Sequence, residues 1–158
     1  MPNRLIVGLI SDTHGLLRPE ALDALRGSDR IIHGGDIGSP DILEALRTIA
    51  PVTAIRGNID KDAWAKSLPA TEIVEIEDSL LYVLHDVNQL DLDPAAAGFR
   101  AVISGHSHAP SREFRAGVLY INPGSAGPRR FRLPITVAKL YVTSTSIEAE
   151  FIPLTSID

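Results

Sequence analysis

Short apolar runs alternate with amphipathic stretches in the N-terminal part of the chain, and this alternation restricts the possible fold more than any other sequence feature. Three runs have the length and composition of buried strands and end in polar residues or glycine, at 5–10, 30–33 and 52–55. Between them, residues 20–26 and 41–49 carry apolar side chains at helical spacing. This order predicts a parallel sheet flanked by helices, with functional loops at the carboxyl ends of the strands.

The second half of the chain predicts further strands with fewer helices between them. They lie at 71–77, 80–84, 101–104, 118–121, 135–141 and 146–152, and we expect the last three to be antiparallel. Asp93 and Pro94 predict the start of one short helix. The sequence contains no repeat, linker or low-complexity segment, and 158 residues suit one compact domain. We therefore expect a single domain over residues 1–158.

Composition excludes several classes of function. The formal net charge is −5, which argues against binding of duplex nucleic acid, because such proteins normally carry a basic excess. The chain has no cysteine, so disulfides, cysteine zinc sites and a thiol nucleophile are excluded. No stretch approaches the ~20 apolar residues that span a membrane, and the first apolar run is too short for a signal peptide. We expect a cytoplasmic protein without a membrane partner.

Residue types that bind metals follow the predicted strands directly. They are Asp12 and His14 after the first strand, Asp36 and Asn58 after the next two, His85 after residues 80–84, and His106 and His108 after residues 101–104. Strand ends at one edge of a sheet converge, so we expect these side chains to meet. In locally extended chain, residues i and i+2 point the same way, so each Asp-x-His or His-x-His pair would bind one ion from one side.

Each of these motifs alone also has a structural explanation. Gly-Asp and Gly-Asn are common turns, and a lone Asp-x-His is more often a turn with a solvated histidine. Their joint occurrence favours a metal site, because four of the five histidines lie in them. The fifth, His33, is expected to be buried rather than a ligand. Carboxylate, imidazole and amide oxygen together suit Mn, Fe, Zn or Ni ions.

The motif set resembles that of a known family. Asp12-x-His14, Gly35-Asp36, Gly57-Asn58, His85 and Gly105-His106-Ser107-His108 are similar, in this order, to the motifs of the calcineurin-like metallophosphoesterases, over residues 5–127. The chain length and the segments at 56–60 and 121–125 resemble the short bacterial, YfcE-like phosphodiesterase branch. The resemblance implies an α/β fold, a four-layer α/β/β/α sandwich of two mixed sheets flanked by helices.

The same resemblance implies a dinuclear centre that hydrolyses a small phosphoester, most simply a phosphodiester. One ion, with Mn expected first, would be held by Asp12, His14, Asp36 and His108, and the other by Asp36, Asn58, His85 and His106. Asp36 would bridge the ions, a hydroxide shared by both ions would be the nucleophile, and Asp36, Asn58 and His106 would act in catalysis. Members of the family often form homodimers.

Two alternatives and two departures stay open. Relatives of this branch serve as protein-binding scaffolds with weak catalysis, and others are nucleotide phosphatases or dinucleoside polyphosphatases. His85 is followed by Asp86, where the family usually has glycine, and Ile59 stands where the larger superfamily commonly has a catalytic histidine. Arg56 and the cluster Arg129, Arg130 and Arg132 are candidates for substrate contact, although arginines at such positions are more often surface or ion-pair residues.

Overall fold

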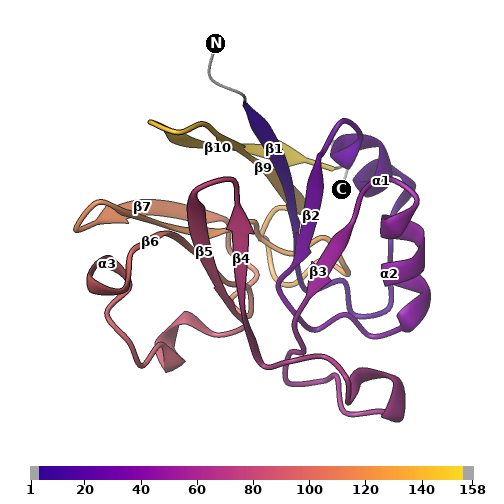
Figure 1. The fold of residues 1–158 in the computed structure, drawn as a ribbon. Helices are drawn as coiled ribbons and strands as arrows, with labels where there is room; N and C mark the ends of the chain where they lie inside the picture. Colours follow the sequence, from indigo (N-terminus) through magenta and orange to yellow (C-terminus); the bar gives the residue numbers. More distant parts are fainter. Residues whose placement is uncertain (1–3, 155–158) are drawn as a thin grey trace.

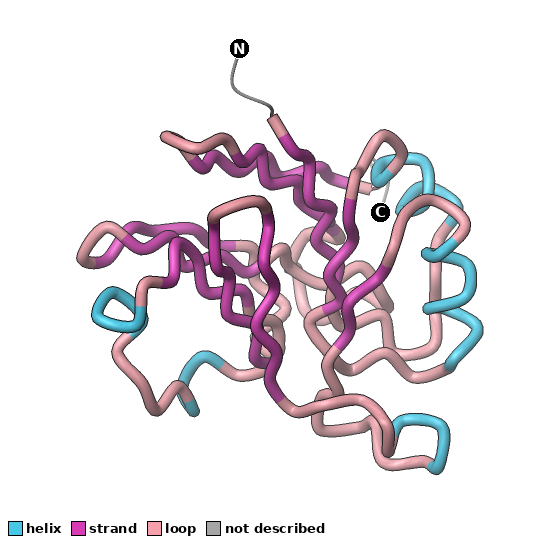
Figure 2. Tube along the Cα trace, viewed as in Figure 1, coloured by secondary structure: helices cyan, strands magenta, loops and turns pink. Residues whose placement is uncertain are grey.

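Two five-stranded β-sheets pack face to face in the structure, a computed structural model that describes residues 4–154 (Figure 1). The first sheet has the order β10 (Ile147–Pro153), β9 (Thr136–Val142), β1 (Leu5–Ile10), β2 (Arg30–His33) and β3 (Val52–Ala54). The second has the order β4 (Thr71–Ile76), β5 (Ser79–Leu84), β6 (Phe99–Ile103), β8 (Val118–Asn122) and β7 (Ser111–Arg115). Figure 2 shows that loops gather where the two sheets end together.

The parallel part of the first sheet aligns the loops that carry the metal-type residues. Strands β1, β2 and β3 are parallel, and Ile10 pairs with His33, which in turn pairs with Ala54. The three strands therefore end at the same level, and the loops that follow them start at one edge. This confirms the β-α-β-α-β arrangement predicted from the sequence.

Helices α1 (Pro19–Leu25) and α2 (Pro40–Arg47) connect these strands and cover the outer face of the first sheet (Figure 1). Each begins with proline, whose fixed φ suits the first helical turn. The Ser39 hydroxyl accepts the Asp41 N–H at 3.3 Å and caps α2. Leu25 and Leu46 are fully buried against the sheet, so the helices are held by packing as well as by their caps.

The main hydrophobic core lies between the sheets and draws on both. Its buried members include Leu9, Ile32, Leu81, Ile103 and Leu140. A second cluster packs beneath α1 and α2, and a third lies on the outer face of the second sheet, below α3 (Pro94–Ala97) and η2 (Val87–Gln89). These layers confirm the predicted four-layer sandwich, with a thin outer layer over the second sheet. Among the described residues, no helix has the length and hydropathy to cross a bilayer.

Two details of the strand prediction were wrong. Strand β7 was not predicted, because all five of its residues are exposed and it pairs only with β8, at the sheet edge. Its sequence therefore lacks the apolar pattern of a buried strand. Strand β8 was expected to be antiparallel, but it runs parallel to β6 and antiparallel only to β7. The expected antiparallel pairing holds for β9 and β10, which extend the first sheet.

The buried side chain of Asp60 ties the loop after β2 to the loop after β3. Its carboxylate accepts the backbone N–H groups of Ile37 at 3.0 Å, Gly38 at 3.1 Å and Gly57 at 2.9 Å. The side chain is 4% exposed, so water cannot easily replace these bonds. Asp60 therefore holds together the two loops that carry Asp36 and Asn58.

We expect Asp60→Ala to lower the free energy of unfolding by about 3 kcal/mol, because it removes the acceptor of three backbone N–H groups. The matched control is Asp62→Ala, an exposed residue before η1 (Ala63–Ala65) whose side chain makes no capping hydrogen bond. Urea unfolding of both variants and the wild type in chelator measures the difference. Equal stability of the two variants would contradict the role of Asp60.

Candidate metal centre

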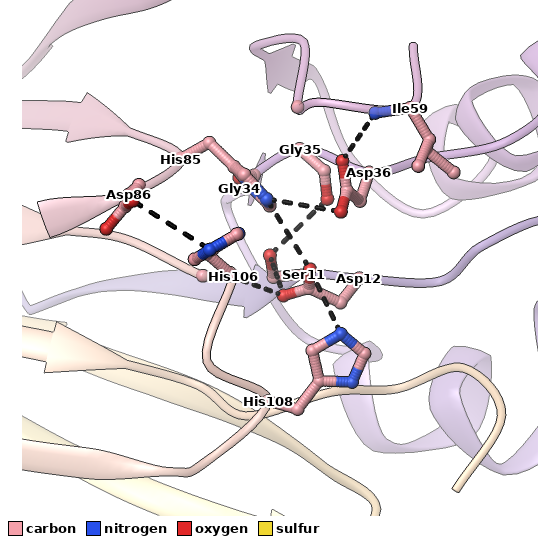
Figure 3. Close-up of polar contacts among 12 residues, drawn as sticks. Ser11, Asp12, Gly34, Gly35, Asp36, Ile59, His85, Asp86, His106 and His108 are labelled. Carbon is pink, nitrogen blue, oxygen red and sulfur yellow. Dashed lines mark hydrogen bonds and ion pairs between the residues drawn. The ribbon is translucent and has the colours of Figure 1, made fainter. Parts of the chain in front are cut away.

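Five of the seven predicted ligands converge where the sheets end together (Figure 3). Asp12 and His14 follow β1, Asp36 follows β2, His85 follows β5 and His108 follows β6. They form two groups, Asp12 with His14 and His108, and Asp12 with Asp36 and His85; within each group the candidate ligand atoms lie within 4.8 Å of one another. Each group has enough carboxylate and imidazole ligands to hold an ion.

The two carboxylates stand at the centre of these groups. Asp36 Oδ2 lies 3.2 Å from His85 Nε2 and 3.5 Å from His14 Nε2. Asp12 Oδ1 lies 3.6 Å from His108 Nε2, 3.7 Å from His85 Nε2 and 3.9 Å from His14 Nε2. One oxygen of each carboxylate thus lies within 4 Å of histidines from both groups.

The remaining two predicted ligands, Asn58 and His106, lie beside these groups. Both are exposed and line one cavity together with His85. The His106 ring stands edge-on to the His85 ring at a centroid distance of 5.2 Å, and its Nε2 lies 3.8 Å from Asp86 Oδ2. The structure therefore brings all seven residues to one place but leaves Asn58 and His106 at its open side.

The backbone at the site is not extended, so the predicted i, i+2 geometry was wrong. Asp12, His14, Asp36, His106 and His108 all have positive φ, between 47° and 73°. They are five of the eight non-glycine residues with positive φ in the described chain. Left-handed backbone is costly for such residues and clusters at functional sites. The paired ligands therefore converge through successive left-handed turns rather than through an extended segment.

Hydrogen bonds hold one oxygen of each carboxylate and leave the other free. Asp12 Oδ2 accepts the Ser11 hydroxyl at 2.8 Å and the His106 backbone N–H at 3.0 Å. Asp36 Oδ1 accepts the Ile59 N–H at 3.1 Å. Asp12 Oδ1 has no hydrogen-bond partner. These anchors orient the free oxygens toward the histidines, as second-sphere hydrogen bonds do in metal sites.

In two histidines, hydrogen bonds with backbone groups determine which ring nitrogen carries the proton. His85 Nδ1 lies 2.7 Å from the Gly34 carbonyl, so Nδ1–H donates and Nε2 is free to bind a metal. His33 Nδ1 accepts the Gly35 N–H at 3.1 Å, and its Nε2–H donates to the Thr13 hydroxyl at 3.0 Å. Burial lowers the pKa of His33 to about 3, so it stays neutral. His33 is thus the buried supporting residue that the sequence predicted.

Burial and neighbouring charges shift the pKa values of the site carboxylates and histidines in opposite directions. Burial raises the pKa of Asp12, although His85 and His108 oppose the shift. Burial would also raise the pKa of Asp36, but His85 and the Ile59 N–H lower it to about 2. Burial lowers the pKa of His108. Without a cation, the two neighbouring carboxylates are stabilised by these imidazoles and by the hydrogen bonds from Ser11, His106 and Ile59.

Unpartnered polar atoms test whether these residues fit a metal. Among the described residues, six buried side-chain nitrogen or oxygen atoms have no hydrogen-bond partner. Four of them are in this site: Asp12 Oδ1, His14 Nε2, His85 Nε2 and His108 Nδ1. An unpartnered buried polar atom is costly, and divalent cations would satisfy lone pairs that no protein donor reaches. The donor set therefore fits divalent metal binding.

The end of β8 and the loop that follows it support the site through residues that ligand motifs do not identify. Asn122 Nδ2 donates to the Gly105 carbonyl at 2.9 Å and to the Ser107 hydroxyl at 3.0 Å. The Ser125 hydroxyl donates to the Asp12 carbonyl at 3.1 Å. The resemblance of the segment at 121–125 to the family was the only sequence signal for these contacts.

A cavity of about 650 Å³ opens from the Asn58, His85 and His106 side of the centre. Its other charged lining residues are Arg56, Asp86 and Asp91. The Arg56 guanidinium donates to the Leu68 carbonyl. Arg129, Arg130 and Arg132 are exposed on the β8–β9 loop and do not line this cavity.

Solved structures share this fold. An archaeal phosphodiesterase superposes with a TM-score of 0.79 at 25% identity, covering 95% of this chain and all of that one. The YfcE phosphoesterase of E. coli has a TM-score of 0.68 at 21% identity, over 96% of this chain and 100% of its own. Vps29 of Cryptosporidium parvum has a TM-score of 0.76 at 17% identity, over 97% and 99%.

Sequence comparison identifies the family. Residues 5–145 match the model of the calcineurin-like phosphoesterase superfamily domain. A probable metallophosphoesterase of Methanothermobacter thermautotrophicus is 35% identical, over 94% of this chain and 92% of that protein. Another from Methanocaldococcus jannaschii is 36% identical, over 95% and 82%. The chain, with its seven converging motif residues, belongs to the calcineurin-like phosphoesterase superfamily.

Proposed function

We propose that this protein, as one domain, is a metal-dependent phosphodiesterase that hydrolyses a small phosphodiester at a centre of two divalent ions. The observation that carries the proposal is the set of buried, unpartnered ligand atoms on Asp12, His14 and His85, beside an open cavity. A probable metallophosphoesterase and a structure described as an archaeal phosphodiesterase are among its relatives. Mn is the expected metal, with Fe, Zn or Ni as alternatives.

In this proposal Asp12, His14, Asp36 and His108 hold one ion, and Asp36, Asn58, His85 and His106 hold the other. The bridging role of Asp36 is supported by the position of its Oδ2, 3.5 Å from His14 Nε2 and 3.2 Å from His85 Nε2. Asp12 Oδ1 is also close to both sides, so its carboxylate would add negative charge to both ions. The anchored second oxygens of both carboxylates would keep this geometry during turnover.

When bound, two ions would supply an activated water and neutralise charge on the phosphoryl oxygens. The side chains of Asn58 and His106 line the cavity and would orient the substrate at the second ion. Asp36 would keep the spacing of the ions fixed. None of these residues has to act as a nucleophile.

The cavity favours a small diester over a polyphosphate chain. Its volume of about 650 Å³ falls in the usual range for small-molecule sites, roughly 300–1,000 Å³. Asp86 and Asp91 are negative, and the one cation on its wall, Arg56, already donates to the Leu68 carbonyl. Because this wall would repel additional phosphates, it argues against the dinucleoside polyphosphate alternative.

The scaffold alternative rests on the fold shared with Vps29. Under that alternative, the buried ligand atoms would not be needed for catalysis. Here all seven ligand positions carry metal-binding residue types, and buried ligand atoms on Asp12, His14 and His85 without a protein partner lie beside an open cavity that can admit a substrate. This favours the enzyme.

Metal content tests the ligand set. After loading with Mn and removal of free metal, we expect about two ions per chain in the wild type. Asp36→Asn should lose most of both, because its carboxylate is proposed to bridge, whereas His108→Ala should mainly lose one. Asp62→Asn, on an exposed loop, is the control and should match the wild type. Elemental analysis gives the ratios; a wild-type value near zero would rule out the site.

Chelation separates the enzyme from the scaffold. Hydrolysis of an aryl phosphodiester should stop in chelator and return when Mn is added. Asp12→Ala should stay inactive under both conditions, because it removes the carboxylate shared by both ligand groups. Turnover by metal-free wild type would disprove the mechanism, and no turnover with both ions bound would support the scaffold.

The leaving group tests proton donation. Ile59 carries no proton donor, and Asp60 is occupied by three backbone N–H groups. A positioned general acid typically contributes about 10²–10⁴-fold. We therefore expect kcat/KM to fall steeply as the leaving-group pKa rises, with aryl diesters far better substrates than alkyl diesters. A flat plot, with chemistry rate-limiting, would show that another residue donates the proton.

A further inference from the structure

Asp86 directly follows the proposed ligand His85, and its carboxylate faces a second proposed ligand, His106. Asp86 Oδ2 lies 3.8 Å from Nε2 of His106, and both residues line the cavity (Figure 3). The Asp86 side chain is 23% exposed and that of His106 is 43% exposed. The pair therefore lies at the mouth of the site, where water competes for an unheld imidazole.

The Asp86 carboxylate is fixed by its own loop. Its Oδ1 accepts the Asn88 N–H at 3.0 Å and caps the short helix η2. This contact holds Oδ2 on the side of His106. The cap thus already orders the Asp86 side chain, so a contact with the imidazole costs little further side-chain entropy.

The His106 ring lacks the anchors that the other histidines have. Its backbone N–H donates to Asp12 Oδ2, but no hydrogen bond to its ring is found among the described residues. His85, by contrast, has Nδ1 held by the Gly34 carbonyl, which leaves Nε2 for a metal. Within residues 4–154, Asp86 is the one charged side chain within 4 Å of a His106 ring nitrogen, and it faces Nε2 rather than Nδ1.

We propose that Asp86 is a positioning residue that accepts the Nε2–H of His106, and so leaves Nδ1 as the nitrogen that would bind the second ion. The inference rests on the proposed metal centre. A carboxylate that accepts the second N–H of a histidine ligand fixes its tautomer and strengthens it as a donor. The present 3.8 Å separation is longer than a hydrogen bond, and a small rotation of the exposed His106 ring would close it.

Asp86→Asn tests this with little change in shape. The amide oxygen can still accept the Asn88 N–H, so the amide NH₂ then faces His106 and opposes the Nε2–H tautomer. Calorimetric titration with Mn²⁺ should show one of the two ions, the one that His106 binds, held about 10- to 100-fold less tightly, with the other ion unchanged. Asp91→Asn removes a carboxylate from the same cavity without a contact to His106, and should match the wild type.

A tautomer measurement keeps this inference separate from the proposed function. In ¹⁵N-detected spectra above the imidazole pKa, His106 should be the Nε2–H form in the metal-free wild type and shift toward Nδ1–H in Asp86→Asn. An Nδ1–H wild type, or equal Mn²⁺ affinities in Asp86→Asn and wild type, would overturn the role of Asp86. The expected tautomers and affinities without phosphodiester turnover would instead refute only the proposed function.

Discussion

Two buried carboxylates in contact with the same histidines are the constraint on which the rest of this structure depends. Asp12 is fully buried and Asp36 is 3% exposed, and their free oxygens converge on His85 and His14. Like charges in such surroundings raise each other's energy unless cations or donors neutralise them. The fold provides hydrogen-bond donors to one oxygen of each carboxylate and leaves the other oxygen facing the histidines. The conformations of the neighbouring loops are consequently those that place donors and histidines around these two carboxylates.

That requirement explains the glycines next to the ligands. Gly35 has a φ of 101°, a left-handed conformation that glycine adopts at little cost. Gly105 and Gly57 are needed for a different reason. A Cβ on Gly105 would lie 2.6 Å from Asp12 Oδ2, and one on Gly57 would overlap the Asp36 carboxylate. These two glycines let backbone approach the carboxylates closely, and Gly57 also donates to Asp60.

The sequence predicted the elements well and their local conformations poorly, and the reason is physical. Strands β1 and β2 were predicted to the residue, because their apolar runs end abruptly at polar residues. The left-handed conformations of Asp12 and His14 follow instead from tertiary hydrogen bonds, since their N–H groups donate to the carbonyls of Gly35 and Asp36. No local pattern contains those partners. The same holds for Asp60, two of whose three donors, Ile37 and Gly38, come from the distant loop after β2.

The geometry of Asp86 distinguishes between two roles for a carboxylate next to His85. From the sequence alone, the Asp86 carboxylate has two candidate roles. One is an acid that donates a proton, and the other is an acceptor that orients a histidine. The geometry distinguishes them, because Asp86 caps η2 with one oxygen and faces the imidazole with the other. Both oxygens of this carboxylate are thus directed at donors, the Asn88 N–H and the His106 ring. It therefore serves better as an acceptor than as a proton donor, and His106, the most exposed histidine of the site, is the one that needs such an acceptor.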